Sequence, residues 1–156
     1  MSDFIHKRHN VSVLLYHIVC PAKYHIVCPA KYRRAIFTDE VDAALRNICF
    51  DISNRYEIIF IEIGTDKDHV HFLVQSVPTM SPTKIVQTIK SITAREIFRR
   101  VPGVKTQLWG GALWTSGYYI NTVSRHGNEA IIRDYVKNQG LVDYKQLHVQ
   151  QLEMFE

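Results

Sequence analysis

The chain has 156 residues, a formal net charge of +4, and hydrophobic and charged fractions of 46% and 22%. This length suits one domain with its own core, and the composition excludes a disordered or fibrous chain. No apolar run is long enough to cross a bilayer, and the N-terminal MSDFIHKRHN lacks the apolar stretch of a signal peptide. We therefore expect a cytoplasmic protein with reduced cysteines and no membrane partner.

A tandem repeat interrupts the first predicted strand. Tyr16–Lys23 (YHIVCPAK) recurs unchanged as Tyr24–Lys31. Solenoid repeats need longer periods and more copies, so a duplication explains this pattern better. We expect a strand from Val11 to about Val19 or Val27, in which one copy pairs and the other loops out. Because the insertion has an even number of residues, either copy can pair without exchanging the two faces of the strand.

The repeat also imitates a zinc site. Two His-x-x-Cys units together supply a four-ligand set. Copying one such unit produces this pattern automatically, so we expect no zinc at the four residues His17, Cys20, His25 and Cys28.

The rest of the chain alternates between helical and strand patterns. The predicted elements are a helix capped by Thr38, a hairpin of residues 57–63 and 69–76 around a turn at 64–68, a helix from Ser81 to about Arg100, a strand region over 113–123, and a last helix over 128–139. This order predicts an α+β, ferredoxin-like (split βαβ) antiparallel sheet with helices on one face plus a C-terminal helix. We expect a single domain over 1–156, with its core at about 11–140 and a polar tail over 141–156.

Two short patterns carry candidate chemistry. His69 and His71 lie two apart on a predicted strand, so their imidazoles share a face and can bind one divalent metal. Tyr135 and Gln139 lie four apart on the last predicted helix, which places a phenol beside an amide oxygen. Each pattern also occurs as ordinary polar residues on a half-exposed face.

The segments around these residues resemble one known family. Asp66–Val74 (DKDHVHFLV) resembles the HUH signature (His, bulky apolar residue, His) of the single-tyrosine transposases of the IS200/IS605 family. Tyr24–Phe37 (YHIVCPAKYRRAIF), Leu108–Trp114 (LWGGALW) and Asp134–Gln139 (DYVKNQ) also resemble that family, in the same order. The resemblance spans nearly the whole chain, from about Val11 to Gly140. The family pattern has one copy of the repeated unit, so this chain differs from it by an eight-residue insertion.

The resemblance implies a reaction and a set of roles. His69, His71 and Gln139 would bind Mg²⁺ (or Mn²⁺), with water and phosphate oxygens completing the coordination. Tyr135 would attack a DNA phosphodiester to form a covalent 5′-phosphotyrosine, and a 3′-OH would later rejoin the strand. The expected partner is single-stranded DNA with subterminal hairpins at the ends of an insertion element. A homodimer is also implied, in which the last helix carries Tyr135 to a composite site in the partner subunit.

Other residues compete for the catalytic roles. Tyr118 and Tyr119 are rival nucleophiles, although packing within a sheet explains two neighbouring aromatic residues equally well. Asp66 and Asp68 are alternative metal ligands, although aspartates next to Gly64 are also typical of a turn.

Basic and aromatic residues indicate contacts with DNA. The predicted DNA-binding residues form a cluster after the first strand and a stripe on the second helix: Lys31, Arg33 and Arg34, then Lys84, Arg95 and Arg99. A solvated helix face explains the stripe as well. Trp109 and Trp114 are candidates for stacking on an unpaired base, but we expect at least one of them to pack under a loop.

The sequence therefore predicts a metal-dependent transposase of single-stranded DNA. One alternative is a domesticated HUH nuclease that cuts single strands at palindromic repeats. Another is a ferredoxin-like module that binds nucleic acid without catalysis and would need neither Tyr135 nor a metal.

Overall fold

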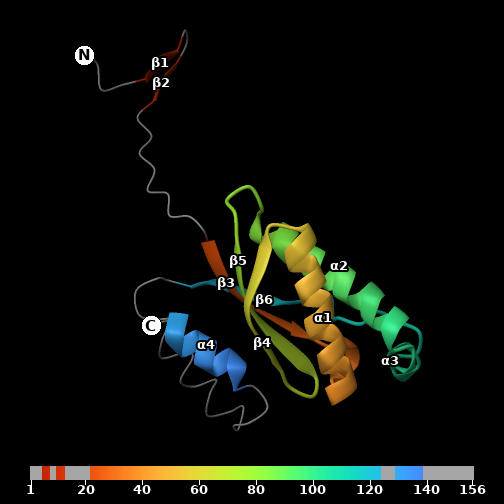
Figure 1. The fold of residues 1–156 in the computed structure, drawn as a ribbon. Helices are drawn as coiled ribbons and strands as arrows, with labels where there is room; N and C mark the ends of the chain where they lie inside the picture. The colour runs from red at the N-terminus through yellow and green to blue at the C-terminus, as the bar shows by residue number, and fades with distance from the viewer. Residues whose placement is uncertain (1–4, 8–9, 13–21, 124–128, 139–156) are drawn as a thin grey trace.

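The computed structural model describes residues 5–7, 10–12, 22–123 and 129–138. A four-stranded sheet lies between two helical layers, with α1 and α2 on one face and α4 on the other (Figure 1). The elements of this layered unit are β3 (Ala22–Pro29), a 3₁₀ turn (Lys31–Arg33), α1 (Asp39–Arg55), β4 (Ile58–Thr65), β5 (His69–Ser76), α2 (Pro82–Arg100), α3 (Gly103–Gln107), β6 (Tyr119–Thr122) and α4 (Glu129–Lys137).

The topology of the sheet is ferredoxin-like. Its strand order is β4-β5-β3-β6, and each neighbouring pair is antiparallel. Two helices connect strands on one face, as in a split βαβ arrangement. The predicted α+β fold with an additional C-terminal helix is therefore confirmed.

Strand β5 is buried on both of its faces. Val70, Phe72 and Val74 belong to the core that packs under α1 and α2, whereas Leu73 belongs to a second cluster with α4. Since side chains alternate along a strand, His69 and His71 lie on the same side as Leu73. The sheet thus separates a mainly apolar core from a face that carries histidines.

The two helices of the larger layer begin where the sequence predicts. The hydroxyl of Thr38 accepts a hydrogen bond from the backbone N–H of Val41, and Ser81 does the same for Lys84. Pro82 occupies the first turn of α2, where it costs no backbone hydrogen bond. The short helix α3 was not predicted, because five residues carry too little periodicity to be recognised.

The first strand differs from its predicted range. It covers Ala22–Pro29, so the second copy of the repeat pairs with β5, and Val11 instead lies in a small hairpin of β1 (Ile5–Lys7) and β2 (Asn10–Ser12). Residues 16–21 of the first copy lie outside the described residues, and so do the predicted tail and the end of the predicted core at Gly140. The looping out of one copy therefore stays a prediction.

Two other boundaries were also wrong. Strand β4 continues through Gly64 and Thr65, which pair with His71 and Val70, so the turn of the hairpin is shorter than expected. The strand predicted over 113–123 is reduced to β6, because Trp114 makes only an isolated bridge with Ala30. No helix in the described ranges combines the length and the apolarity that a bilayer crossing requires.

Deleting Tyr16–Lys23 should leave the fold intact. The deletion places Leu14 and Leu15 before Tyr24, where Ala22 and Lys23 now stand, and these residues suit a strand at least as well. We expect an unchanged or higher midpoint of thermal unfolding by circular dichroism, compared with the full chain. A fall of more than about 4 °C, corresponding to roughly 1 kcal/mol or more, would show that the first copy has become structural.

Candidate active site

Three imidazoles and one phenol meet between the sheet and α4. His25 comes from β3, His69 and His71 from β5, and Tyr135 from α4, and all four side chains are buried. The ring centroids of His69 and His71 lie 5.0 Å apart, and those of His71 and Tyr135 lie 5.2 Å apart. The ring of His25 lies 5.9 Å from that of Tyr135. The face that the sequence predicted for His69 and His71 is therefore also the face on which Tyr135 packs.

The register of the sheet places His25 beside His71. Val27 pairs with His71 and His25 pairs with Leu73, so the two histidines are diagonal neighbours on one face. Their rings stack with centroids 5.2 Å apart, and Nε2 of His25 lies 2.9 Å from Nδ1 of His71. This hydrogen bond fixes the orientation of the His71 ring.

A second contact orients His69. Its Nδ1 lies 2.7 Å from Oδ1 of Asp68, whose Oδ2 accepts a hydrogen bond of 3.0 Å from Nε of Arg33. With Nδ1 engaged on both rings, Nε2 is the nitrogen that each histidine would present to a metal. Nε2 of His71 is buried and makes no hydrogen bond within the described part of the chain. The donor set therefore fits a metal ion bound through imidazole nitrogen.

Burial sets the charge of the imidazoles. It lowers the pKa of His25 to about 4, and burial followed by the nearby His25 and His69 lowers the pKa of His71 well below its usual value. Partial burial raises the pKa of Asp68, but the hydrogen bond with His69 and the charge of Arg33 outweigh this and lower it overall. At neutral pH the site thus combines the neutral imidazoles of His25 and His71 with the ionised carboxylate of Asp68, and a neutral imidazole can bind a metal.

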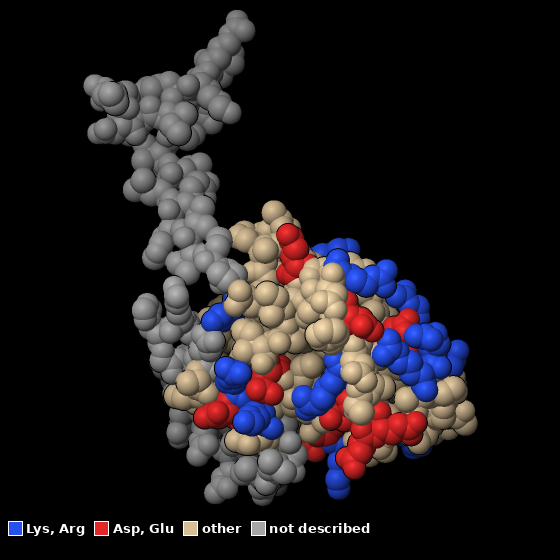
Figure 2. Space-filling model, in the orientation of Figure 1, with Lys and Arg blue, Asp and Glu red and all other residues tan. Residues whose placement is uncertain are grey.

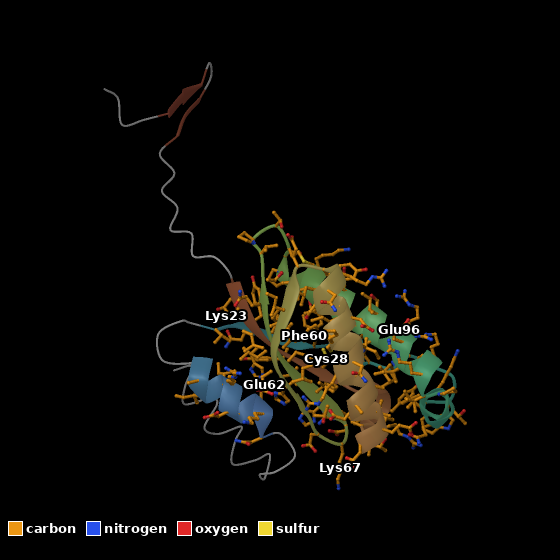
Figure 3. The ribbon with its side chains drawn as sticks, in the orientation of Figure 1. Lys23, Cys28, Phe60, Glu62, Lys67 and Glu96 are labelled. Atoms are coloured by element: carbon orange, nitrogen blue, oxygen red, sulfur yellow. The ribbon has the colours of Figure 1, made fainter. Side chains whose placement is uncertain are left out.

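Helix α4 is docked by an apolar face and an ion pair. Ile132, Tyr135 and Val136 pack with Leu73 and Val123. At the edge of this contact, Arg133 lies 3.7 Å from Glu62, which is labelled between β4 and α4 in Figure 3. Tyr135 therefore contacts the histidines of its own chain.

The remaining predicted site residues lie in different places. Gln139 lies outside the described residues. Tyr119 is partly exposed, and its ring centroid lies 6.1 Å from that of His25, as expected for diagonal neighbours on paired strands. Tyr118 instead lies under the ammonium group of Lys90. Asp66 accepts a hydrogen bond from the backbone of Lys67, as expected for a turn.

No group of three or more histidine, cysteine or acidic side chains is placed to bind a metal within the residues that the structure covers. His25 and Cys28 lie three apart on β3, so their side chains are on opposite faces of the sheet. Cys28 lies in the apolar core, where burial raises its pKa to about 12 and keeps the thiol protonated. This half of the His-x-x-Cys repeat therefore does not form a ligand pair.

The predicted DNA-binding residues form two separate surfaces. Lys31, Arg33 and Arg34 follow β3 and adjoin the site, since the backbone N–H of Ala30 donates to the carbonyl of Asp68. Lys84, Arg95 and Arg99 lie on α2, beyond the sheet, where Figure 2 shows basic side chains interleaved with acidic ones. Glu96 pairs with Arg95 and Arg99, and Thr88, which lies one turn after Lys84 on the same face of the helix, is buried. The stripe on α2 is therefore interrupted and partly neutralised.

Sequence reasoning did not find the two residues that orient the metal-ligand candidates. The sequence indicated that His25 belongs to an imitation of a zinc site, and that Asp68 is either a turn residue or an alternative metal ligand. A histidine on an otherwise apolar strand was the one signal for His25. Only the pairing of β3 with β5 brings it to His71.

Comparisons with known proteins give the family. The sequence model described as "Transposase IS200 like" matches residues 18–139. The chain belongs to the IS200-like transposase family. It is 36% identical over 134 residues to the ISDra2 transposase TnpA of Deinococcus radiodurans, covering 85% of this chain and 88% of that protein. It is also 30% identical to a Salmonella typhimurium transposase for insertion sequence element IS200, covering 86% of this chain and 80% of that protein.

A solved structure agrees with this assignment. The fold of this IS200-like transposase matches a Deinococcus radiodurans crystal structure described as a transposase, with a TM-score of 0.63 and 31% identity. The match covers 82% of this chain and 98% of that chain. The predicted family, the fold and the activity of a single-tyrosine transposase are therefore confirmed, and the family is generally metal-dependent.

The lowered pKa of His25 should make the stability of the metal-free protein depend on pH. In the unfolded chain histidine binds a proton near pH 6.5, whereas His25 in the fold does so only near pH 4. The contribution of His25 to the free energy of unfolding is then fully present above pH 6.5. It is lost as the pH drops toward 4, which lowers the free energy of unfolding by on the order of 3 kcal/mol. Urea unfolding in EDTA at several pH values measures this loss. The free energy of unfolding should fall less steeply with decreasing pH in His25→Phe than in the wild type. An equal pH dependence in both proteins would contradict the assignment of this loss to His25.

Proposed function

We propose that this transposase cuts single-stranded DNA with Tyr135 as the nucleophile. The observation that carries the proposal is the packing of the Tyr135 ring 5.2 Å from that of His71, on the buried face that also holds His69. A phenol packed against one candidate metal ligand, on the face that holds the second, suits metal-assisted attack on a phosphodiester. Family membership supports the same roles.

We assign His69, His71 and Gln139 as the ligands of Mg²⁺ or Mn²⁺. The oriented Nε2 atoms of the two imidazoles support the first two assignments. Gln139 follows Tyr135 by four residues, as the family resemblance implies. With no carboxylate among the ligands, affinity for the ion should be modest. When bound, the ion would polarise the scissile phosphate and help to orient it for in-line attack.

Strand transfer would proceed in two steps, cleavage by Tyr135 and rejoining by a 3′-OH. The oxygen of Tyr135 bonds to phosphorus and loses its proton, while the bond between phosphorus and the 3′ oxygen breaks and that oxygen leaves as a 3′-OH. The energy of the broken phosphodiester bond is conserved in the new bond between Tyr135 and the 5′ phosphate. A 3′-OH can then attack the same phosphorus and release Tyr135, so the strand is rejoined without an external energy source.

The partner that fits this chemistry is single-stranded DNA whose hairpins mark the ends of an insertion element. The homodimer with composite sites, and the location at the nucleoid, belong to the same proposal. Because Tyr135 contacts His25 and His71 of its own chain, a composite site would require α4 to dock on a second subunit instead. Size-exclusion chromatography with light scattering measures the oligomeric state.

A denaturing gel tests the nucleophile. The protein is incubated, in Mg²⁺ or in EDTA, with labelled single strands of the DNA that flanks the gene for this transposase. We expect a covalent protein–DNA adduct that needs Mg²⁺ and is absent from Tyr135→Phe. Tyr118→Phe and Tyr119→Phe are the matched controls and should still form it. An adduct that persists in Tyr135→Phe and disappears in Tyr119→Phe would move the nucleophile to β6.

Metal binding should depend on the hydrogen bond between His25 and His71. His25→Phe keeps an aromatic ring in the stack but removes the nitrogen that contacts Nδ1 of His71. We expect Mn²⁺ affinity, measured by electron paramagnetic resonance, to fall about 10- to 100-fold, which is the usual effect of losing a contact that orients a ligand. His25→Gln, whose amide can bond to the same atom, should retain more of the affinity. Equal Mn²⁺ affinity in the wild type and in His25→Phe would show that His25 does not orient His71 for metal binding.

A further inference from the structure

An exposed pair of aromatic rings lies beside the candidate active site. Tyr32, in the turn after β3, is 59% exposed, and Trp109, in the loop after α3, is 70% exposed. Their ring centroids lie 5.3 Å apart in an edge-to-face contact. In contrast, Trp114 is buried, and its indole N–H donates to the hydroxyl of Thr93. One tryptophan of the chain is therefore a core residue, and the other presents its ring to solvent.

Cationic side chains lie against both rings. The guanidinium carbon of Arg34 lies 4.6 Å from the centroid of Trp109, and the ammonium nitrogen of Lys31 lies 5.3 Å from that of Tyr32. These distances are within the range of cation–π interactions. The Tyr32–Trp109 pair thus combines flat apolar surfaces with positive charge.

The backbone holds the pair in an unusual conformation. Tyr32, Arg33 and Trp109 have φ angles of 58°, 52° and 52°, a left-handed region that bulky side chains rarely adopt. Hydrogen bonds fix both segments, from Lys31 N–H to the Leu113 carbonyl (2.7 Å) and from Gly110 N–H to the Lys105 carbonyl (2.8 Å). Strained backbone that persists with this support is concentrated at functional sites. The rings are therefore presented by fixed segments.

The pair is connected to the candidate active site through Asp68. Arg33, between Tyr32 and Arg34, donates to Asp68, and Asp68 contacts His69. Arg33, the residue that follows Tyr32, and His69 thus contact the same carboxylate, which places the segment that carries Tyr32 beside the candidate active site.

We propose that the Tyr32–Trp109 pair is a stacking site for an unpaired base of single-stranded DNA, with Lys31 and Arg34 supplying positive charge for the adjacent phosphates. The proposal rests on the proposed function for the identity of the polymer, and it adds a position at which that polymer is held. An unpaired base presents a free face, whereas a base within a duplex is already stacked on its neighbours. Stacking on an aromatic side chain accepts any base, so this site contributes affinity more than sequence preference.

Trp109 supplies its own probe. The protein is kept in EDTA so that no strand is cut. It is titrated with an oligothymidylate of about sixteen nucleotides and with a duplex of the same length. We expect the single strand to quench the tryptophan fluorescence of the wild type, and the quenching to be absent in Trp109→Phe, which retains only the buried Trp114. Affinity is measured separately, by the anisotropy of a labelled oligothymidylate.

Three variants separate stacking from general effects. Trp109→Ala should weaken binding about tenfold, the usual effect of removing one stacking ring, and Trp109→Phe should weaken it much less. Phe50→Ala removes a ring of α1 that is similarly exposed (68%), and it should bind as the wild type does. The proposal is overturned if Trp109→Ala binds like the wild type, if Phe50→Ala weakens binding equally, or if the duplex quenches as strongly as the single strand.

The outcome is independent of catalysis. Quenching that depends on Trp109, in a protein that forms no covalent adduct, would leave the stacking site in place and reject the proposed cleavage. An adduct at Tyr135, combined with unchanged DNA binding in Trp109→Ala, would support the proposed cleavage and reject the stacking site.

Discussion

The antiparallel pairing of β3 with β5 is the constraint on which the site depends. Its register sets Val27 opposite His71 and His25 opposite Leu73, which brings Nε2 of His25 to Nδ1 of His71. Because side chains alternate along a strand, a shift of one residue in β5 would turn both of its histidines into the core under α1 and α2. Val70, Phe72 and Val74 prevent such a shift, since they would have to leave that core. The apolar face therefore fixes the position of the polar one.

Helix α4 then converts an array of histidines into a candidate active site. Its apolar residues cover the face of the sheet and hold Tyr135 at the ring of His71, and burial on this face keeps His25 and His71 neutral. Burying three imidazoles is unfavourable unless their nitrogen atoms have partners. The contacts of His25 with His71, and of Asp68 with His69, supply partners on the side away from the proposed metal. The same contacts orient both rings.

The sequence was sufficient for the parts of the structure that depend on local rules. Two histidines spaced for a strand face, a serine–proline helix start and a threonine cap depend on local spacing and capping, and the structure contains all three. His25 could not be assigned in this way, because the repeat offers an identical histidine eight residues earlier and only strand pairing distinguishes the copies. Likewise, Trp109 and Trp114 have similar neighbours in the sequence, yet one is exposed and the other bonds to Thr93.

The position of the covalent bond tests the account most directly. After incubation with Mg²⁺ and a cleavable single strand, the adduct is digested with nuclease and trypsin and analysed by mass spectrometry. We predict a nucleotide attached to the peptide of residues 134–137, DYVK, which contains Tyr135 as its one tyrosine. A nucleotide on the peptide of residues 106–125, which contains Tyr118 and Tyr119, would contradict the assignment of α4 as the catalytic helix.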